Sequence, residues 1–105
     1  MYQLIIYIPQ SHCEQVKHAL FDAGAGSYNN YDQCAWQVSG TGQFRSLKGS
    51  SPFIGETNTV TQIDEVKVEM ICKEQYIQSA IIAMLAAHPY EEPAYLILKH
   101  HTITL

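Results

Sequence analysis

The sequence has no long apolar run and few basic residues, and both shortages argue against whole classes of partner. No apolar stretch approaches the roughly 20 residues of a transmembrane helix, and the amino terminus lacks the basic start and apolar core of a signal peptide. Six Lys and Arg stand against ten Asp and Glu, which gives a formal net charge of -4. Such a charge does not attract nucleic acid or an anionic membrane. We therefore expect a cytoplasmic protein with neither of these partners.

Cysteines and catalytic motifs are also scarce. Cys13, Cys34 and Cys72 cannot all pair, and none belongs to a CxxC, so we expect neither a disulfide framework nor a thiolate zinc site. We interpret them as buried free thiols. The chain contains neither the phosphate-binding GxxxxGK[ST] nor the nucleophile motif GxSxG. The sequence therefore does not predict an enzyme.

What the chain does contain is enough apolar material for one core. Its 105 residues are 47% hydrophobic and 15% charged, which is typical of a single compact domain over residues 1–105. Alternating or continuous apolar positions predict strands at 2–8, 34–39, 66–72 and 95–103. The order strand, helix, strand, strand, helix, strand predicts an α+β, ferredoxin-like (βαββαβ) fold, an antiparallel sheet with two helices on one face.

The two helices have different signals. Ser11, followed by Glu14 three residues later, predicts a capping box at the start of the first helix, which Gly24 and Gly26 end. The second helix has a wide apolar stripe at i, i+3, i+4, i+7 and i+8 and ends before Pro89. The stripe consists of Ile77, Ala80, Ile81, Met84 and Leu85.

The first and last strands are apolar on both faces. Helices cover only one face of the predicted sheet, so the other face needs a second cover. We therefore expect that face to be buried against other subunits in a homo-oligomer.

The segment 40–56 is too long for a hairpin turn, and loops of this length in compact domains are usually functional. Its large apolar residues predict that it folds onto something. Arg45, Lys48 and the hydroxyls of Ser50 and Ser51 could cradle an anion, and glycines such as Gly49 permit close approach of the backbone. The alternative is a structural arm that locks subunits together.

The stretch AHPYEEPAY at 87–95 also allows two interpretations. His88 with Glu91 or Glu92 could supply ligands to a divalent cation or an acid and base pair, although adjacent carboxylates in an extended segment point in opposite directions. The alternative is purely structural, because Pro89 stops a helix and Pro93 favours an extended chain before it. His12 and His18 are expected to face solvent.

The stretches GTGQFRSLKGSSPFIG, DEVKVE and AHPYEEPAY together resemble the ferredoxin-like domain inserted in the YqfO-type dinuclear-metal-centre hexameric proteins, and small stand-alone proteins made of that domain. HPYE followed closely by Pro is shared with the CutA divalent-cation tolerance proteins. Both groups resemble the PII signalling proteins in fold.

This resemblance implies an oligomeric PII-like and CutA-like module, a trimer more than a dimer, with a regulatory or ligand-sensing role. In YqfO-type proteins the two metals are held by a flanking domain that this sequence does not contain, so that site does not carry over. The CutA resemblance implies His88 and Glu91 as ligands of a divalent metal ion, the one cofactor that we consider.

Three functional hypotheses follow, and the least favoured is an enzyme, in which only His88 and a Glu could supply acid and base. The other two are binding proteins. The first is a non-enzymatic oligomeric module that binds a small molecule or a protein partner. Its ligand-binding residues would be Arg45, Lys48, Gly49, Ser50, Ser51 and Tyr90, in a cleft between subunits that segments 40–56 and 88–92 line. The second is a divalent-metal-binding protein of CutA type that uses His88 and Glu91.

Overall fold

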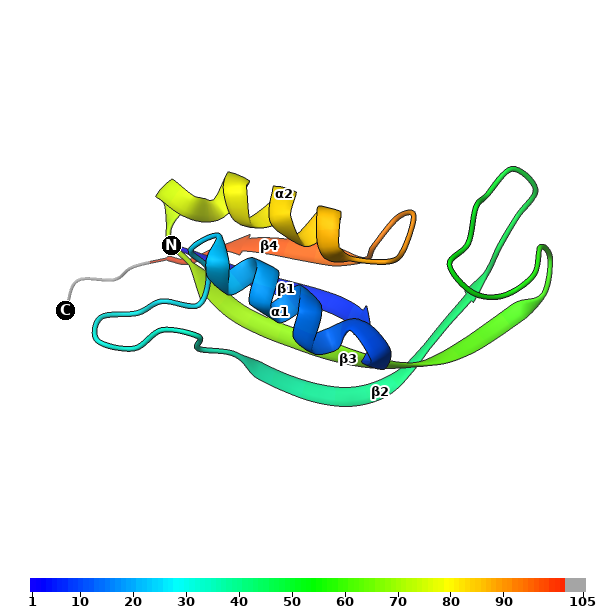
Figure 1. Cartoon of the computed structure of the whole chain (residues 1–105), viewed down its shortest axis with the longest axis horizontal. Coiled ribbons are helices and arrows are strands. Elements are labelled where there is room, and N and C mark those ends of the chain that lie inside the picture. The colour runs from blue at the N-terminus through cyan, green and yellow to red at the C-terminus, as the bar shows by residue number, and fades with distance from the viewer. Residues whose placement is uncertain (102–105) are drawn as a thin grey trace.

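The computed structural model describes residues 1–101 as a four-stranded antiparallel sheet with two helices on one face (Figure 1). The elements follow one another as β1 (Tyr2–Pro9), α1 (Cys13–Asp22), β2 (Trp36–Arg45), β3 (Val60–Cys72), α2 (Ile77–Ala87) and β4 (Tyr95–Lys99). The strand order is β2-β3-β1-β4, with every neighbouring pair antiparallel. The predicted ferredoxin-like fold is confirmed.

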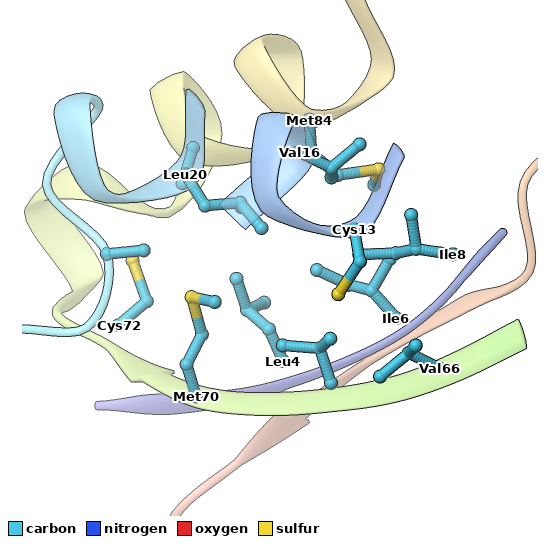
Figure 2. Packing of buried hydrophobic residues seen from close by; sticks show 13 residues of the cluster. Leu4, Ile6, Ile8, Cys13, Val16, Leu20, Val66, Met70, Cys72 and Met84 are labelled. Atoms are coloured by element: carbon cyan, nitrogen blue, oxygen red, sulfur yellow. The ribbon is translucent and has the colours of Figure 1, made fainter. Parts of the chain in front are cut away.

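The core lies between the sheet and the helix layer, as Figure 2 shows. Alternate side chains of β1 and β3 point toward the helices, and α1 and α2 direct their apolar stripes down onto them. The fully buried side chains include Leu4, Ile6, Val16, Leu20 and Met84. Cys13 and Cys72 are free, buried thiols as predicted, and burial raises the pKa of both; Cys34 is free and half-buried.

The predicted capping box is wrong. A short 3-10 turn, Gln10–His12, follows β1 directly, so α1 begins at Cys13 with His12 as its N-cap and no side-chain cap. Ser11 lies inside that turn, and its hydroxyl shares a hydrogen bond of 2.8 Å with Nδ1 of His12. A second 3-10 turn, Glu74–Tyr76, precedes α2.

The β2–β3 hairpin is longer than the sequence indicates. Residues 40–45 and 60–65 pair in the sheet, so the predicted loop 40–56 becomes the shorter loop 46–59, which we call the β2–β3 loop. The hairpin extends well beyond the helices (Figure 1). β4 ends at Lys99, residues 100 and 101 are not in a strand, and the predicted extension to position 103 lies outside the described residues.

One face of the sheet has no helix on it. Strand partners share a face, so Leu96 and Leu98 of β4 lie on the side of Ile5, opposite the core, and Trp36 and Val38 of β2 lie on that side as well. These four large side chains are between 45 and 58% exposed. Within residues 1–101, no helix is long and apolar enough to cross a membrane.

Candidate functional site

A pocket of about 620 Å³ lies where the β2–β3 loop faces the turn 88–94, which connects α2 to β4. In Figure 1 the turn is orange and the loop is green. The end of β2 and Glu65 of β3 also contribute to the lining. The lining residues include Phe44, Arg45, Phe53, Glu65, Tyr90, Glu91 and Glu92. Two segments about 40 residues apart in the sequence therefore meet at one pocket within a single chain.

His88 anchors the turn to the sheet. Its ring is only 6% exposed, and Nε2 lies 2.8 Å from the backbone oxygen of Tyr7 in β1. Nδ1 accepts a hydrogen bond of 3.1 Å from the backbone N–H of Tyr90, which assigns the proton to Nε2. Burial lowers the pKa of His88, and the Tyr7 carbonyl and the Glu65 carboxylate oppose that shift. Neutral His88 therefore fixes where the turn begins.

Tyr90 connects the turn to the hairpin. Its hydroxyl donates a hydrogen bond of 2.6 Å to Oε2 of Glu65 in β3. Burial and this carboxylate raise the pKa of the phenol, so it stays a donor at neutral pH. The Tyr90 ring lies 4.8 Å from that of His88, 6.2 Å from that of Phe53 and 6.5 Å from that of Phe44, measured between ring centroids. Tyr90 thus holds the centre of an aromatic cluster.

Within residues 1–101, one hydrogen bond joins the β2–β3 loop to the turn 88–94. The backbone N–H of Ser51 donates to Oε1 of Glu91 over 3.1 Å. Phe53 adds aromatic contacts, since its ring packs edge-on against that of His12 at 5.3 Å and lies tilted against that of Tyr90. The prediction that the loop's apolar residues fold onto something is met only in part, because Phe53 contacts its own chain while Leu47, Phe53 and Ile54 are still between 44 and 55% exposed.

Gly42 leaves room for the Glu65 side chain, and this gives a testable prediction. A Cβ at Gly42 would overlap the Glu65 carboxylate, whereas a Cβ at Gly40, on the same face of β2, would meet nothing within 4 Å. Gly42→Ala should displace the carboxylate from Tyr90 and lower the free energy of unfolding by about 1–3 kcal/mol. Gly40→Ala, the matched control, should leave it unchanged or raise it slightly. Urea unfolding followed by circular dichroism compares them, and equal losses in both variants would contradict this role of Glu65.

The structure brings together some of the predicted ligand-binding residues. Arg45, Ser50 and Tyr90 line the pocket, whereas Lys48, Gly49 and Ser51 are not part of its lining. The Ser50 hydroxyl donates to the backbone oxygen of Leu47 at 2.7 Å, and the Ser51 N–H is taken by Glu91. Two of the loop's donors, the Ser50 hydroxyl and the Ser51 N–H, thus already serve the chain itself, which argues against their part in an anion cradle. The binding roles of these six residues stay predictions.

The predicted metal ligands are close in sequence but engaged elsewhere. Both ring nitrogens of His88 have hydrogen-bond partners in the chain, and Glu91 accepts from Ser51. Among residues 1–101, no group of three or more His, Cys, Asp and Glu side chains is placed to hold a metal ion. This geometry does not favour a metal site at His88 and Glu91, which stays a prediction.

Sequence reasoning missed three contributors to the site. Glu65 lies just outside the predicted strand 66–72 and has no predicted role, and Phe44 counts only among the apolar residues of segment 40–56. His12 was expected to face solvent, but it is half-buried against Phe53. The available signal was Glu65 within DEVKVE, because strand alternation places its carboxylate on the face of β3 opposite the core.

Known proteins resemble the chain over most of its length. No protein-family model matches the chain. Curated proteins named GTP cyclohydrolase 1 type 2 homolog match it: the one from Halalkalibacterium halodurans is 41% identical over 95 residues, 90% of this chain and 26% of that protein. The one from Bacillus subtilis is 41% identical over 93 residues, 89% of this chain and 25% of that protein. The predicted resemblance to the YqfO-type proteins is confirmed.

Solved structures support both parts of that resemblance. A Bacillus cereus protein related to NIF3 superposes with a TM-score of 0.79 at 35% identity, covering 92% of this chain and 24% of that one. CutA from Pyrococcus horikoshii superposes with a TM-score of 0.69 at 15% identity, covering 99% and 88%. The CutA likeness shows the fold alone. The chain spans about a quarter of the length of the curated relatives it matches.

Proposed function

We propose that this YqfO-type chain is a homo-oligomeric module that binds a small ligand in the pocket between the β2–β3 loop and the turn 88–94. One observation carries the proposal: the two segments with the most unusual sequences converge on one pocket of about 620 Å³. That volume lies within the roughly 300–1,000 Å³ of small-molecule sites. Aromatic walls with a few polar groups are the usual lining of such sites.

A fragment screen by NMR tests the binding site. Fragments that bind should shift the backbone amide signals of Phe53 and Tyr90 and leave that of Ile82 unchanged, because Ile82 lies on α2 with 68% of its side chain exposed and is not part of this pocket. A screen in which no fragment moves the Phe53 and Tyr90 signals would remove the support for a ligand site.

The face of the sheet that no helix covers, which we call the open face, supports the proposed oligomer. Trp36 and Val38 at one edge, and Leu96 and Leu98 at the other, leave large apolar side chains exposed on the side without helices. A second copy of the chain that covers this face would bury them. A trimer is the state that the sequence resemblance implies.

A charge on the open face should therefore dissociate the oligomer. Leu96→Glu places a carboxylate where a partner would need an apolar contact, so we expect a monomer at micromolar concentration. Ile82→Glu, which introduces the same charge on the outer side of α2, should keep the oligomer. Size-exclusion chromatography with light scattering gives both masses. A monomeric wild type, or a Leu96→Glu protein with the wild-type mass, would contradict this interface.

We propose binding without catalysis. The curated relatives are named as homologues of a GTP cyclohydrolase, and that name describes proteins about four times as long as the matched segment. We expect GTP incubated with the purified chain to remain unchanged by chromatography. Turnover that His88→Ala abolishes would make the chain an enzyme. The cytoplasmic location stays a prediction.

A further inference from the structure

The charge of the pocket lining is the first observation that restricts the ligand. Three carboxylates, those of Glu65, Glu91 and Glu92, line the pocket together with one guanidinium, that of Arg45. Among residues 1–101, no carboxylate forms an ion pair with Arg45. The lining is therefore net negative at pH 7, which favours positively charged ligands over anions.

The carboxylates also keep unused acceptors. Glu65 accepts from Tyr90 through Oε2, and Glu91 accepts from Ser51 through Oε1. Within residues 1–101, no hydrogen bond is described to the other oxygen of either residue or to the carboxylate of Glu92. A ligand in this pocket therefore meets acceptors that a protonated amine can satisfy.

The placement of the acids favours a larger cation over a metal ion. Glu65, Glu91 and Glu92 line one pocket, yet they do not form a group that could hold a metal within the described part of the chain. Carboxylates distributed around a cavity match a cation whose charge sits on a larger organic framework.

Aromatic rings complete this environment. The planes of Phe44 and Phe53 are tilted by 54° and 47° to that of Tyr90, and all three residues line the pocket. The rings of Phe44 and Phe53 therefore do not stack face to face on Tyr90. Ring faces attract flat ring systems and cations, so they fit a ligand that has both.

From these observations we infer that the pocket takes a small organic cation with a flat aromatic part, an aromatic amine or a protonated nitrogen heterocycle. The inference rests on the proposed function, since it names the ligand class of the same pocket. Arg45 would meet an acceptor group of the ligand at the side of the pocket where β2 ends.

Calorimetric titration with three probes that share one ring tests the ligand class. Tryptamine is a cation, indole-3-propionate an anion and tryptophol neutral at pH 7.5. In low salt, tryptamine should bind at least about ten-fold more tightly than indole-3-propionate, with tryptophol between them. Glu92→Gln should weaken tryptamine binding about three-fold or more and leave tryptophol unchanged. Glu74→Gln, the same change at an exposed residue outside the pocket, should leave all three affinities unchanged.

Other results would overturn the inference in distinguishable ways. If indole-3-propionate binds as tightly as tryptamine or more tightly, the pocket binds ligands but the charge class is wrong. The class also fails alone if none of the three probes binds while fragments still shift the amide signals of Phe53 and Tyr90. If none of the three probes binds and no fragment shifts those signals, both the ligand class and the proposed function fail.

Discussion

Met84→Ala is expected to lower the free energy of unfolding by about 2–5 kcal/mol, because it empties part of a closely packed core. Met84 has no exposed surface and lies between α2 and the sheet, as Figure 2 shows. The next residue, Leu85, is 42% exposed on the same helix. Leu85→Ala, the matched control, should change the free energy of unfolding by less than about 1 kcal/mol, because little packing is lost at such a site.

Urea unfolding followed by circular dichroism measures both variants, at one protein concentration because assembly adds to apparent stability. The two midpoints should separate clearly, with Leu85→Ala close to the wild type. Similar losses at both positions would mean that the assembly buries Leu85 too. An unchanged Met84→Ala protein would contradict the packing between α2 and the sheet.

This pair also shows how far periodicity predicts a fold. The stripe from Ile77 to Leu85 correctly indicated a helix and the side that faces the sheet. The structure buries Ala80 and Met84 fully and leaves Leu85 exposed. Helical spacing determines the direction of a side chain, whereas its depth depends on which element lies opposite. The depth of a side chain is set by the tertiary structure, so the sequence pattern did not predict it.

The candidate site, like the core, was predicted only in part. The β2–β3 loop and the turn 88–94 were each predicted as unusual from composition and prolines, but their meeting was not predicted. It depends on the register of the long hairpin, which pairs Gly40 with Glu65 and Gly42 with Ile63. Alternating polar residues and glycines leave such a register weakly specified in the sequence. Glu65 therefore appeared as one acid among several, and its bond to Tyr90 was found only in the structure.

The open face had a clearer signal. The continuous apolar residues of β1 and β4 predicted a second buried face, and the structure places Ile5, Leu96 and Leu98 there without a helix above them. A face of this kind is costly in an isolated domain. The apolar pattern therefore favours the proposed assembly through this face in addition to predicting the fold of one chain.

The second large effect is expected at His88, where stability should depend on pH. Burial lowers the pKa of His88 below the ordinary 6.5, and nearby His12 lowers it further. The carbonyl of Tyr7 and the charge of Glu65 raise this pKa and so oppose part of the shift. In the unfolded chain the ring takes a proton near pH 6.5, whereas in the folded chain it does so only at lower pH. Between these values the unfolded state binds more protons, so the free energy of unfolding falls as pH falls.

Replacing His88 by Gln isolates this contribution. At pH 7.5 the variant should be less stable by about 1–3 kcal/mol, because a buried ring and at least one of its hydrogen bonds are lost. The stability difference between the wild type and His88→Gln should stay constant above about pH 6.5 and shrink as pH falls below it. His100→Gln, at an exposed histidine, should follow the wild-type curve. A gap that widens at low pH would mean that protonated His88 is the form that the fold prefers, with the turn 88–94 then held by a charged ring that donates to Tyr7 but can no longer accept from Tyr90.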